Sequence, residues 1–356
     1  MKKLLHKLRR KKKSTVAEAQ PSSLRITNET VAEHRERILA GGRKFKYPLQ
    51  YPKHRIVAIT VALVLAAVVS FFGFVLWQLY GVQNTSKFMY NITQIVPVPV
   101  AEVDKQSVRY SDYLVELRSA LHYLSTKEAV NLSTDDGKRQ LDYQKRLAIN
   151  KAIQNAYVEK LAKQQGVAVS DKEVNDFIHN EISGNRLGVT EDVYRQVIRD
   201  YYDWSFDEYK HSVKHQLLRK KLVAKIDTEG RQKIENAILK PLQQGAQFAD
   251  IAKQQSEDTL TKENGGDIGF VTKTSDDPSG LIDVASKLQP NQTSGIIEGM
   301  DGFYVVKLLE TKDGSVHFAK IFVAYSAFDK KFEALKKSGG VKEYIKISET
   351  VRAGGT

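Results

Sequence analysis

The sequence predicts one membrane-spanning helix, then an all-α domain, then an α+β domain. Three observations lead to this fold class: an uncharged apolar run near the N-terminus, a long stretch with apolar residues at helical spacing, and a final third in which helices alternate with strand-like segments. With 356 residues, 41% of them hydrophobic, the chain is long and apolar enough to build two or three domains with separate cores.

The net charge of +13 is concentrated at the N-terminus. Residues 1–55 contain 16 Lys or Arg and four Glu, which leaves 39 basic and 38 acidic residues in the rest of the chain. Because the body of the protein is nearly neutral, the basic excess does not indicate nucleic-acid binding. We interpret residues 1–55 as a basic cytoplasmic tail that sets membrane topology and contacts anionic lipid.

The apolar run from Ile56 to Trp77 has no charged residue over 22 positions. As a helix it would be roughly 33 Å long, which matches a hydrocarbon core of about 30 Å. We predict a transmembrane helix at 56–80, with Trp77 and Tyr80 in an interfacial aromatic belt. The positive-inside rule then places the N-terminus in the cytoplasm and the C-terminal body outside the cell membrane. A cleaved signal peptide fits less well, because its apolar region would be shorter.

Residues 81–101 are predicted to be an extended linker. Pro97 and Pro99 alternate with valines there, a pattern that favours an extended conformation. Such a linker would hold the body of the protein off the bilayer.

Residues 102–227 have the periodicity of an all-α domain. A first apolar stripe runs from Tyr110 to Leu124, and a second helix is predicted at 138–165, ending at Gly166. Ser170 and Glu173 have the spacing of a capping box for a third helix, and two more are predicted near 190–202 and 205–226. Aromatic side chains left exposed on these helices would suit a groove for extended apolar segments.

Residues 228–326 mix helices with strands. Helices are predicted at 231–244, 248–255 and around 281–288, and strands at 268–271, 301–310 and 316–325. In KENGGDIGF, residues 262–270, three glycines mark a forced turn into a strand, since glycine accepts a positive φ and lets another backbone pass closely. The C-terminal segment, 327–356, follows the last strand.

Four ordered segments of this region resemble parvulin-type peptidyl-prolyl isomerases, the PpiC-like rotamases. They are ILKPLQQGAQFADIAKQQSED, NGGDIGF, LQPNQTSGII and GFYVVKLLE. Upstream, VAEVDKQSVRYSDY, YVEKLAKQQGVAVSDKEVNDFI and DEYKHSVKHQLLRKKL resemble the helical chaperone domain of SurA-like and PrsA-like foldases. The resemblance covers roughly residues 100–310. It implies an all-α chaperone domain at 102–227 and an α+β parvulin-like domain at 228–326.

The resemblance also implies a site. The family's Cys or Asp falls on Asp258, the His of its last strand falls on Tyr304, and the Met and Phe that line its proline slot fall near Asp277 and Leu281. Ile268 and Phe270 are expected to complete the slot walls. A prolyl isomerase needs an apolar slot for the ring and polar groups that favour the twisted amide, so no cofactor is expected.

The family opens with a histidine-bearing strand, but here the helix ending at Ile226 runs almost directly into DTEGRQKI. The strand at 316–325 could fill the vacant central place as a circular permutation, or it could be an ordinary extra strand, and both alternatives stay open. In the permuted sheet the residue at the catalytic position is Lys320, or His317 if the register slips.

We therefore interpret the chain as a membrane-anchored extracytoplasmic foldase that binds unfolded client polypeptides. In one hypothesis it also catalyses X-Pro cis/trans isomerisation. In the other it is a non-catalytic chaperone or assembly scaffold, because the family's histidines and its Met-Phe wall are replaced. The chain has no cysteine, and His211 and His215 have no apparent third ligand, so no metal site is expected.

Overall fold

The structure is a computed structural model that describes residues 27–46, 53–183, 189–275 and 277–348. The chain divides into two compact units, Met1–Gly73 and Phe74–Thr356, which are described separately. Residues 1–26, which form much of the predicted basic tail, lie outside the described residues.

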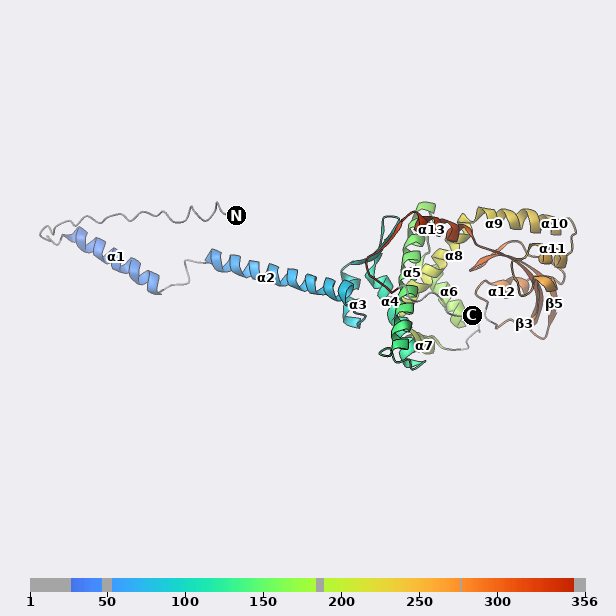
Figure 1. Ribbon diagram of the computed structural model, residues 1–356, viewed down its shortest axis with the longest axis horizontal. Coiled ribbons are helices and arrows are strands. Elements are labelled where there is room, and N and C mark those ends of the chain that lie inside the picture. The colour runs from blue at the N-terminus through green and yellow to red at the C-terminus, as the bar shows by residue number, and fades with distance from the viewer. Residues whose placement is uncertain (1–26, 47–52, 184–188, 276, 349–356) are drawn as a thin grey trace. The chain divides into compact units, whose positions relative to one another are not determined.

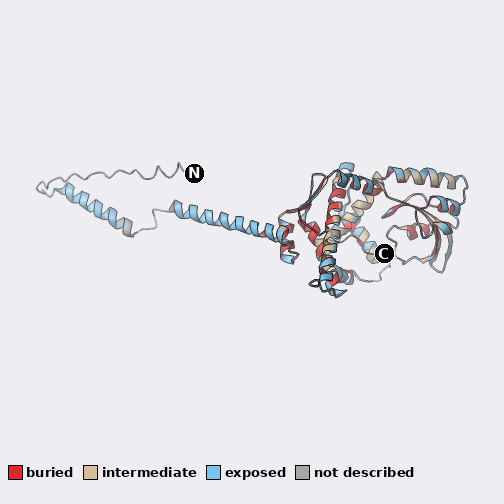
Figure 2. Ribbon diagram, in the orientation of Figure 1, coloured by how far each residue is buried: buried red, intermediate tan, exposed pale blue. Residues whose placement is uncertain are grey.

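The first unit consists of helix α1, Asn28–Lys46, and most of helix α2, Lys53–Leu76. α2 continues into the second unit as a π-helical turn, η1, Trp77–Gly81. The helical stretch Arg55–Gly81 is long and apolar enough to cross a membrane, by length and composition. Figure 2 shows α2 exposed to its surroundings over most of its length, as a lipid-facing helix would be, with Val75 near its C-terminal end buried.

The helical part of the second unit follows the predicted periodicity (Figure 1). Its helices are α3 Lys87–Ile95, α4 Tyr110–Thr126, α5 Asp135–Gln165, α6 Asp171–Ser183, α7 Glu191–Tyr202 and α8 Phe206–Ile226. Gly166 ends α5 in the left-handed conformation, as predicted. Ser170 and Glu173 exchange the two hydrogen bonds of the predicted capping box, so the local sequence signals are sufficient to define these helix ends.

The prediction of an extended linker at 81–101 is wrong. Residues 87–95 form α3, whose inner side buries Met89, Tyr90 and Thr93. The prolines and valines that follow enter β1, Pro99–Val103, in which Val100 and Val103 are fully buried. The alternating pattern was that of a half-buried strand, so this stretch is part of the domain core and does not act as a spacer.

The helical domain also contains a small sheet, which the all-α prediction missed. β1 pairs with β2, Gln106–Arg109, and with β7, Val341–Glu343, in the order β2-β1-β7. β7 comes from the C-terminal segment, together with helix α13, Ala327–Lys337. Phe328 and Phe332 of α13 pack on Tyr157 of α5, with ring centroids 5.7 Å apart in each pair. Residues 327–343 therefore return to the helical domain.

The α+β domain has the predicted order of elements. Its helices are α9 Thr228–Lys233, η2 Ile234–Leu239, α10 Lys240–Gln243, α11 Phe248–Gln255, η3 Lys262–Asn264 and α12 Leu281–Ala285, and its strands are β3 Asp267–Thr272, β4 Ile297–Glu298, β5 Gly302–Lys312 and β6 Ser315–Ala324. Helices α9 and α11 contact one face of the sheet, and α12 covers the other (Figure 1).

The sheet is antiparallel with the order β3-β6-β5-β4, so β6 lies in its interior. β5 and β6 form a hairpin through Asp313 and Gly314, which both have positive φ. β6, which corresponds to the strand predicted at 316–325, thus lies between β3 and β5. The chain enters and leaves this domain at one point, where the buried Asp227 carboxylate accepts hydrogen bonds from the backbone N–H of Gly230 at 2.9 Å and of Ser326 at 2.6 Å.

Gly266 explains the glycine-rich turn before β3. Its φ is +82°, and a Cβ built on it would lie 2.2 Å from the carbonyl oxygen of Lys320 on β6. In addition, the Gly266 carbonyl accepts a 2.8 Å hydrogen bond from the Lys320 N–H. Only glycine fits where two backbones approach this closely, and the turn therefore sets the position of Lys320.

Candidate functional site

A pocket of about 390 Å³ lies on the sheet face that α12 covers. It is lined by Ile268, Val271, Asp277, Pro278, Ser279, Leu281, Ile282, Met300, Asp301, Tyr304, Phe318 and Lys320. Five of the residues predicted for the site are in this lining: Ile268, Asp277, Leu281, Tyr304 and Lys320. Its walls are mainly apolar, whereas its polar groups come from β5, β6 and the loops before α12 and β5.

Lys320 and Asp258 form an ion pair at the edge of the pocket, with 3.0 Å between Nζ and Oδ2. The Thr261 hydroxyl donates a 2.6 Å hydrogen bond to the same carboxylate. Burial on its own would raise the pKa of Asp258, but the hydrogen bonds from Thr261 and Lys320 and the lysine charge outweigh it and lower the pKa. Asp258 thus stays ionised near neutral pH and holds the lysine ammonium in place.

Tyr304 lies beside this pair, with its ring centroid 6.0 Å from Lys320 Nζ. Its hydroxyl donates a 2.6 Å hydrogen bond to Asp301 Oδ1, and its ring packs on Phe322 at 4.8 Å between centroids. Burial, followed by the hydrogen bond to Asp301, raises the pKa of Tyr304, so the phenol remains neutral. It presents a fixed aromatic wall to the pocket.

Asp277 lies near the predicted position of an apolar wall residue, and its carboxylate has a local structural role. It accepts hydrogen bonds from the backbone N–H groups of Leu281 at 2.6 Å and Ile282 at 2.7 Å, the first residues of α12. A buried carboxylate is tolerated there because it is hydrogen-bonded to a helix start. The charge therefore positions Leu281 in the slot.

Two predicted site residues lie outside the pocket. His317 is three positions before Lys320 on β6 and therefore points to the opposite face, where its Nε2 is 2.7 Å from Asp267 Oδ1. Phe270 is half-exposed and packs on His317, with ring centroids 4.8 Å apart. The reason is a register shift in β3 between Asp267 and Phe270, which turns the side chains after it and brings Val271 into the lining instead.

Several lining residues were not predicted from the sequence, among them Phe318, Met300 and Val271. Phe318 could have been found, because it lies two positions before Lys320 and so shares its face of the strand. Met300 comes from the loop before β5 and has no periodic signal.

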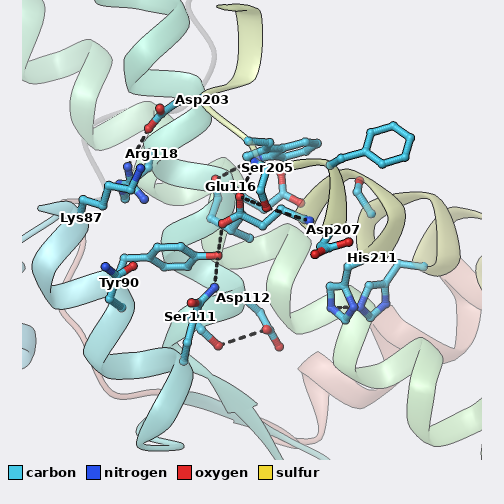
Figure 3. Close-up of a pocket in the computed structure, with 18 of the residues that line it drawn as sticks. Lys87, Tyr90, Ser111, Asp112, Glu116, Arg118, Asp203, Ser205, Asp207 and His211 are labelled. Atoms are coloured by element: carbon cyan, nitrogen blue, oxygen red, sulfur yellow. Dashed lines mark hydrogen bonds and ion pairs between the residues drawn. The ribbon is translucent and has the colours of Figure 1, made fainter. Parts of the chain in front are cut away.

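A larger cleft of about 910 Å³ lies among α3, α4, α7 and α8 in the helical domain (Figure 3). Tyr90 donates a 2.5 Å hydrogen bond to Glu208 Oε1, and Arg118 pairs with Asp203 at 2.7 Å. The Arg118 guanidinium also lies 5.0 Å from the Tyr90 ring centroid. The cleft thus combines aromatic faces with charges of both signs.

His211, which is exposed, and His215, which is half-buried, both line this cleft. Their Nε2 atoms are 2.9 Å apart, and Glu159 Oε1 is 3.4 Å from His215 Nε2. Burial, with a smaller contribution from His211, lowers the pKa of His215 to about 4. In the described part of the chain, no group of three His, Cys, Asp or Glu side chains is placed to hold a metal ion.

Comparisons with known proteins match both halves of this architecture. A family model described as the SurA-like N-terminal domain matches residues 52–223, and one described as the PPIC-type PPIASE domain matches residues 215–310. The chain is of the parvulin type, with a SurA-like N-terminal domain. The PPIC-type match ends at residue 310, before β6 begins at Ser315.

Three relatives with curated descriptions each match part of this chain. Foldase protein PrsA from Streptococcus sanguinis is 27% identical over 51% of this chain and 62% of its own length. Periplasmic chaperone PpiD from Haemophilus influenzae is 34% identical over 29% of this chain and 17% of its own length. Chaperone SurA from Methylobacillus flagellatus is 27% identical over 50% of this chain and 38% of its own length. The chain thus spans less than two thirds of each of these relatives.

Among solved structures, a PrsA peptidylprolyl isomerase from Bacillus anthracis is matched at 20% identity over 54% of this chain and 87% of that chain, with a TM-score of 0.20. The assignment to the parvulin type rests on the family models and on the two domains described above.

Proposed function

We propose that the protein is a membrane-anchored foldase whose helical cleft holds unfolded client polypeptides and whose sheet pocket binds X-Pro segments and accelerates their isomerisation. The N-terminus is cytoplasmic and the body extracytoplasmic in this proposal. The observation that carries it is the Lys320–Asp258 pair at the edge of an apolar pocket, beside the Tyr304 ring.

The pocket chemistry fits a prolyl substrate. Leu281, Phe318 and Ile268 supply an apolar surface for the proline ring. As the amide twists, its nitrogen loses conjugation and becomes a better hydrogen-bond acceptor. The Lys320 ammonium has three N–H donors, so it can hold Asp258 with one and donate another to that nitrogen. A donor that acts mainly on the twisted state lowers the barrier, which is near 20 kcal/mol without a catalyst.

The experiment compares Lys320→Met with His317→Ala in the full chain, reconstituted in lipid nanodiscs. Both residues lie on β6, but His317 is on the face away from the pocket, which makes it a matched control. We expect the wild-type chain and His317→Ala to accelerate cis-to-trans conversion of X-Pro peptides, and Lys320→Met to lose about tenfold or more of this acceleration. Asp258→Asn should lose part of it, because the lysine is then less firmly held.

A non-catalytic scaffold is the second candidate function. It is favoured by one observation, the internal pairing of the polar groups: Lys320 with Asp258, and Tyr304 with Asp301. Under this alternative the wild-type chain binds unfolded clients and suppresses their aggregation, but none of the variants differs from wild type in isomerisation rate because there is no acceleration to lose.

A further inference from the structure

Helix α3 has an apolar side that faces away from the protein. Phe88 is 61% exposed and Ile95 is 83% exposed. They are seven residues apart and therefore lie on the same side of the helix, opposite the buried Met89 and Thr93. α3, KFMYNITQI, contains no acidic residue. Exposed apolar side chains such as Phe88 and Ile95 on the outer face of a short helix indicate that an apolar partner covers this face.

The end of the apolar span is joined to the same core that carries α3. Val75 and Leu79 are buried in the core of the helical domain. The Tyr110 hydroxyl of α4 donates a 2.6 Å hydrogen bond to the Leu79 carbonyl, and the Tyr80 hydroxyl donates to the carbonyl of Pro99 in β1. Tyr80 therefore packs into the protein and does not belong to the lipid-facing aromatic belt that its position in the sequence predicted.

The short connection between the span and α3 is also held by hydrogen bonds. The Asn84 side chain donates to Gln78 Oε1 at 2.8 Å and accepts from the Ser86 N–H at 2.8 Å, and Ser86 caps α3 by accepting from Met89 N–H. The Gln83 side chain donates a 2.7 Å hydrogen bond to the Lys346 carbonyl. Because residues 82–86 can reach at most about 20 Å, α3 begins close to the place where the span leaves the bilayer.

We propose that α3 lies on the membrane surface, with Phe88 and Ile95 inserted at the boundary between lipid headgroups and acyl chains. The occupant of its outer face is thus the bilayer that the span itself crosses. An amphipathic helix with aromatic and aliphatic residues on one side and no acidic residue on the other binds at this depth. The inference rests on the membrane anchoring in the proposed function.

This placement has a consequence for client binding. Lys87, Tyr90, Asn91 and Gln94, on the neighbouring side of α3, line the large cleft (Figure 3). A bilayer against Phe88 and Ile95 brings the cleft opening next to the membrane surface. The protein then receives client segments as they emerge from the membrane and does not collect them from the surrounding solution.

The test uses single-cysteine variants, because the chain contains no cysteine of its own. Phe88→Cys and Ile95→Cys are labelled with an environment-sensitive fluorophore in the full chain, in nanodiscs with or without lipids that carry a nitroxide quencher near the headgroup. Leu260→Cys, at an apolar position of the α+β domain that is 88% exposed, is the matched control. Val64→Cys, in the middle of the span, is read with a quencher placed deep in the acyl chains.

We expect labels at 88 and 95 to be quenched several-fold more than the label at 260, and the label at 64 to be quenched by the deep nitroxide. If position 64 is quenched while 88 and 95 behave like 260, α3 is not on the bilayer and the inference is wrong, although the anchor stands. If 88 and 95 are shielded from aqueous iodide without lipid quenching, a protein covers α3, and the inference is also wrong. If position 64 is not quenched, the proposed membrane anchoring is wrong, and the inference about α3 is wrong with it.

Discussion

The two cavities of the protein differ in how their charges are arranged. In the sheet pocket, Lys320 pairs with Asp258 at one edge, Asp277 and Asp301 accept hydrogen bonds from neighbouring protein groups, and most of the other lining residues are apolar. In the helical cleft, which has more than twice the volume, the lining contains several guanidinium groups, carboxylates and aromatic rings. Under the proposed function, the first arrangement would select one compact ring, whereas the second would offer partners to many different side chains.

The difference also extends to the backbone that supports each cavity. The pocket depends on one close approach, between Gly266 and the Lys320 carbonyl, and on the single buried carboxylate of Asp227 that joins the two ends of the domain. Three of the four helices that frame the cleft, α3, α7 and α8, have a side-chain cap at the N-terminus, such as Ser205 with Glu208. A single substitution should therefore damage the pocket far more than the cleft.

The largest expected effect is that of Gly266→Ala. The new methyl group would clash with the Lys320 carbonyl at a positive φ, and we expect the α+β domain to lose about 3 kcal/mol or more of unfolding free energy. Gly269→Ala is the control, because φ there is +75° but a Cβ would meet nothing within 4 Å, so strain alone should cost about 1 kcal/mol. Hydrogen exchange should locate the loss in β3 and β6. Equal losses in the two variants would show that the close approach is unimportant.

The next largest effect is expected at acid pH, where the contribution of His215 in the cleft to stability should be lost at a higher pH than that of Asp258 at the pocket. The folded-state pKa of His215 is about 4, below its ordinary value of 6.5, so the unfolded chain binds a proton that the folded chain does not. Stability that is present above pH 6.5 is therefore lost as the pH falls towards 4, by up to about 3 kcal/mol. The pKa of Asp258 is also lowered, from 3.8, so its contribution persists until the pH falls below that value.

Denaturant unfolding followed by tryptophan fluorescence tests this order, because Trp204 lies in the cleft and the other tryptophan, Trp77, is at the end of the span. The midpoint should fall between pH 7 and 5, and His215→Gln should flatten that dependence. A midpoint that is constant over this range in the wild-type chain would contradict the assignment to His215.

The sequence was sufficient where the signals are local. Alternation predicted the strand that forms β6, and the capping box at Ser170 defined a helix start. Prediction from the sequence failed where contacts between residues far apart in the chain determine the structure. The bulge in β3 that turns Phe270 out of the pocket depends on pairing with β6, and the burial of α3 and β1 depends on the core that they join. A prediction from a single sequence has no access to these pairings.

The smallest expected effect concerns the residue before proline. The carboxylates of Asp277 and Asp301 line the sheet pocket and Asp258 borders it, against the one ammonium of Lys320, so the pocket carries an excess of negative charge. We expect Lys-Pro peptides to bind a few-fold more tightly than Glu-Pro peptides, with a difference of about 1 kcal/mol or less that salt reduces. Competition binding at low and high salt measures it. Because the helical cleft carries charges of both signs, client binding there should be nearly indifferent to the same exchange. A preference for Glu-Pro would mean that the Lys320 ammonium dominates the pocket and that its three carboxylates are neutralised by the bonds they already make.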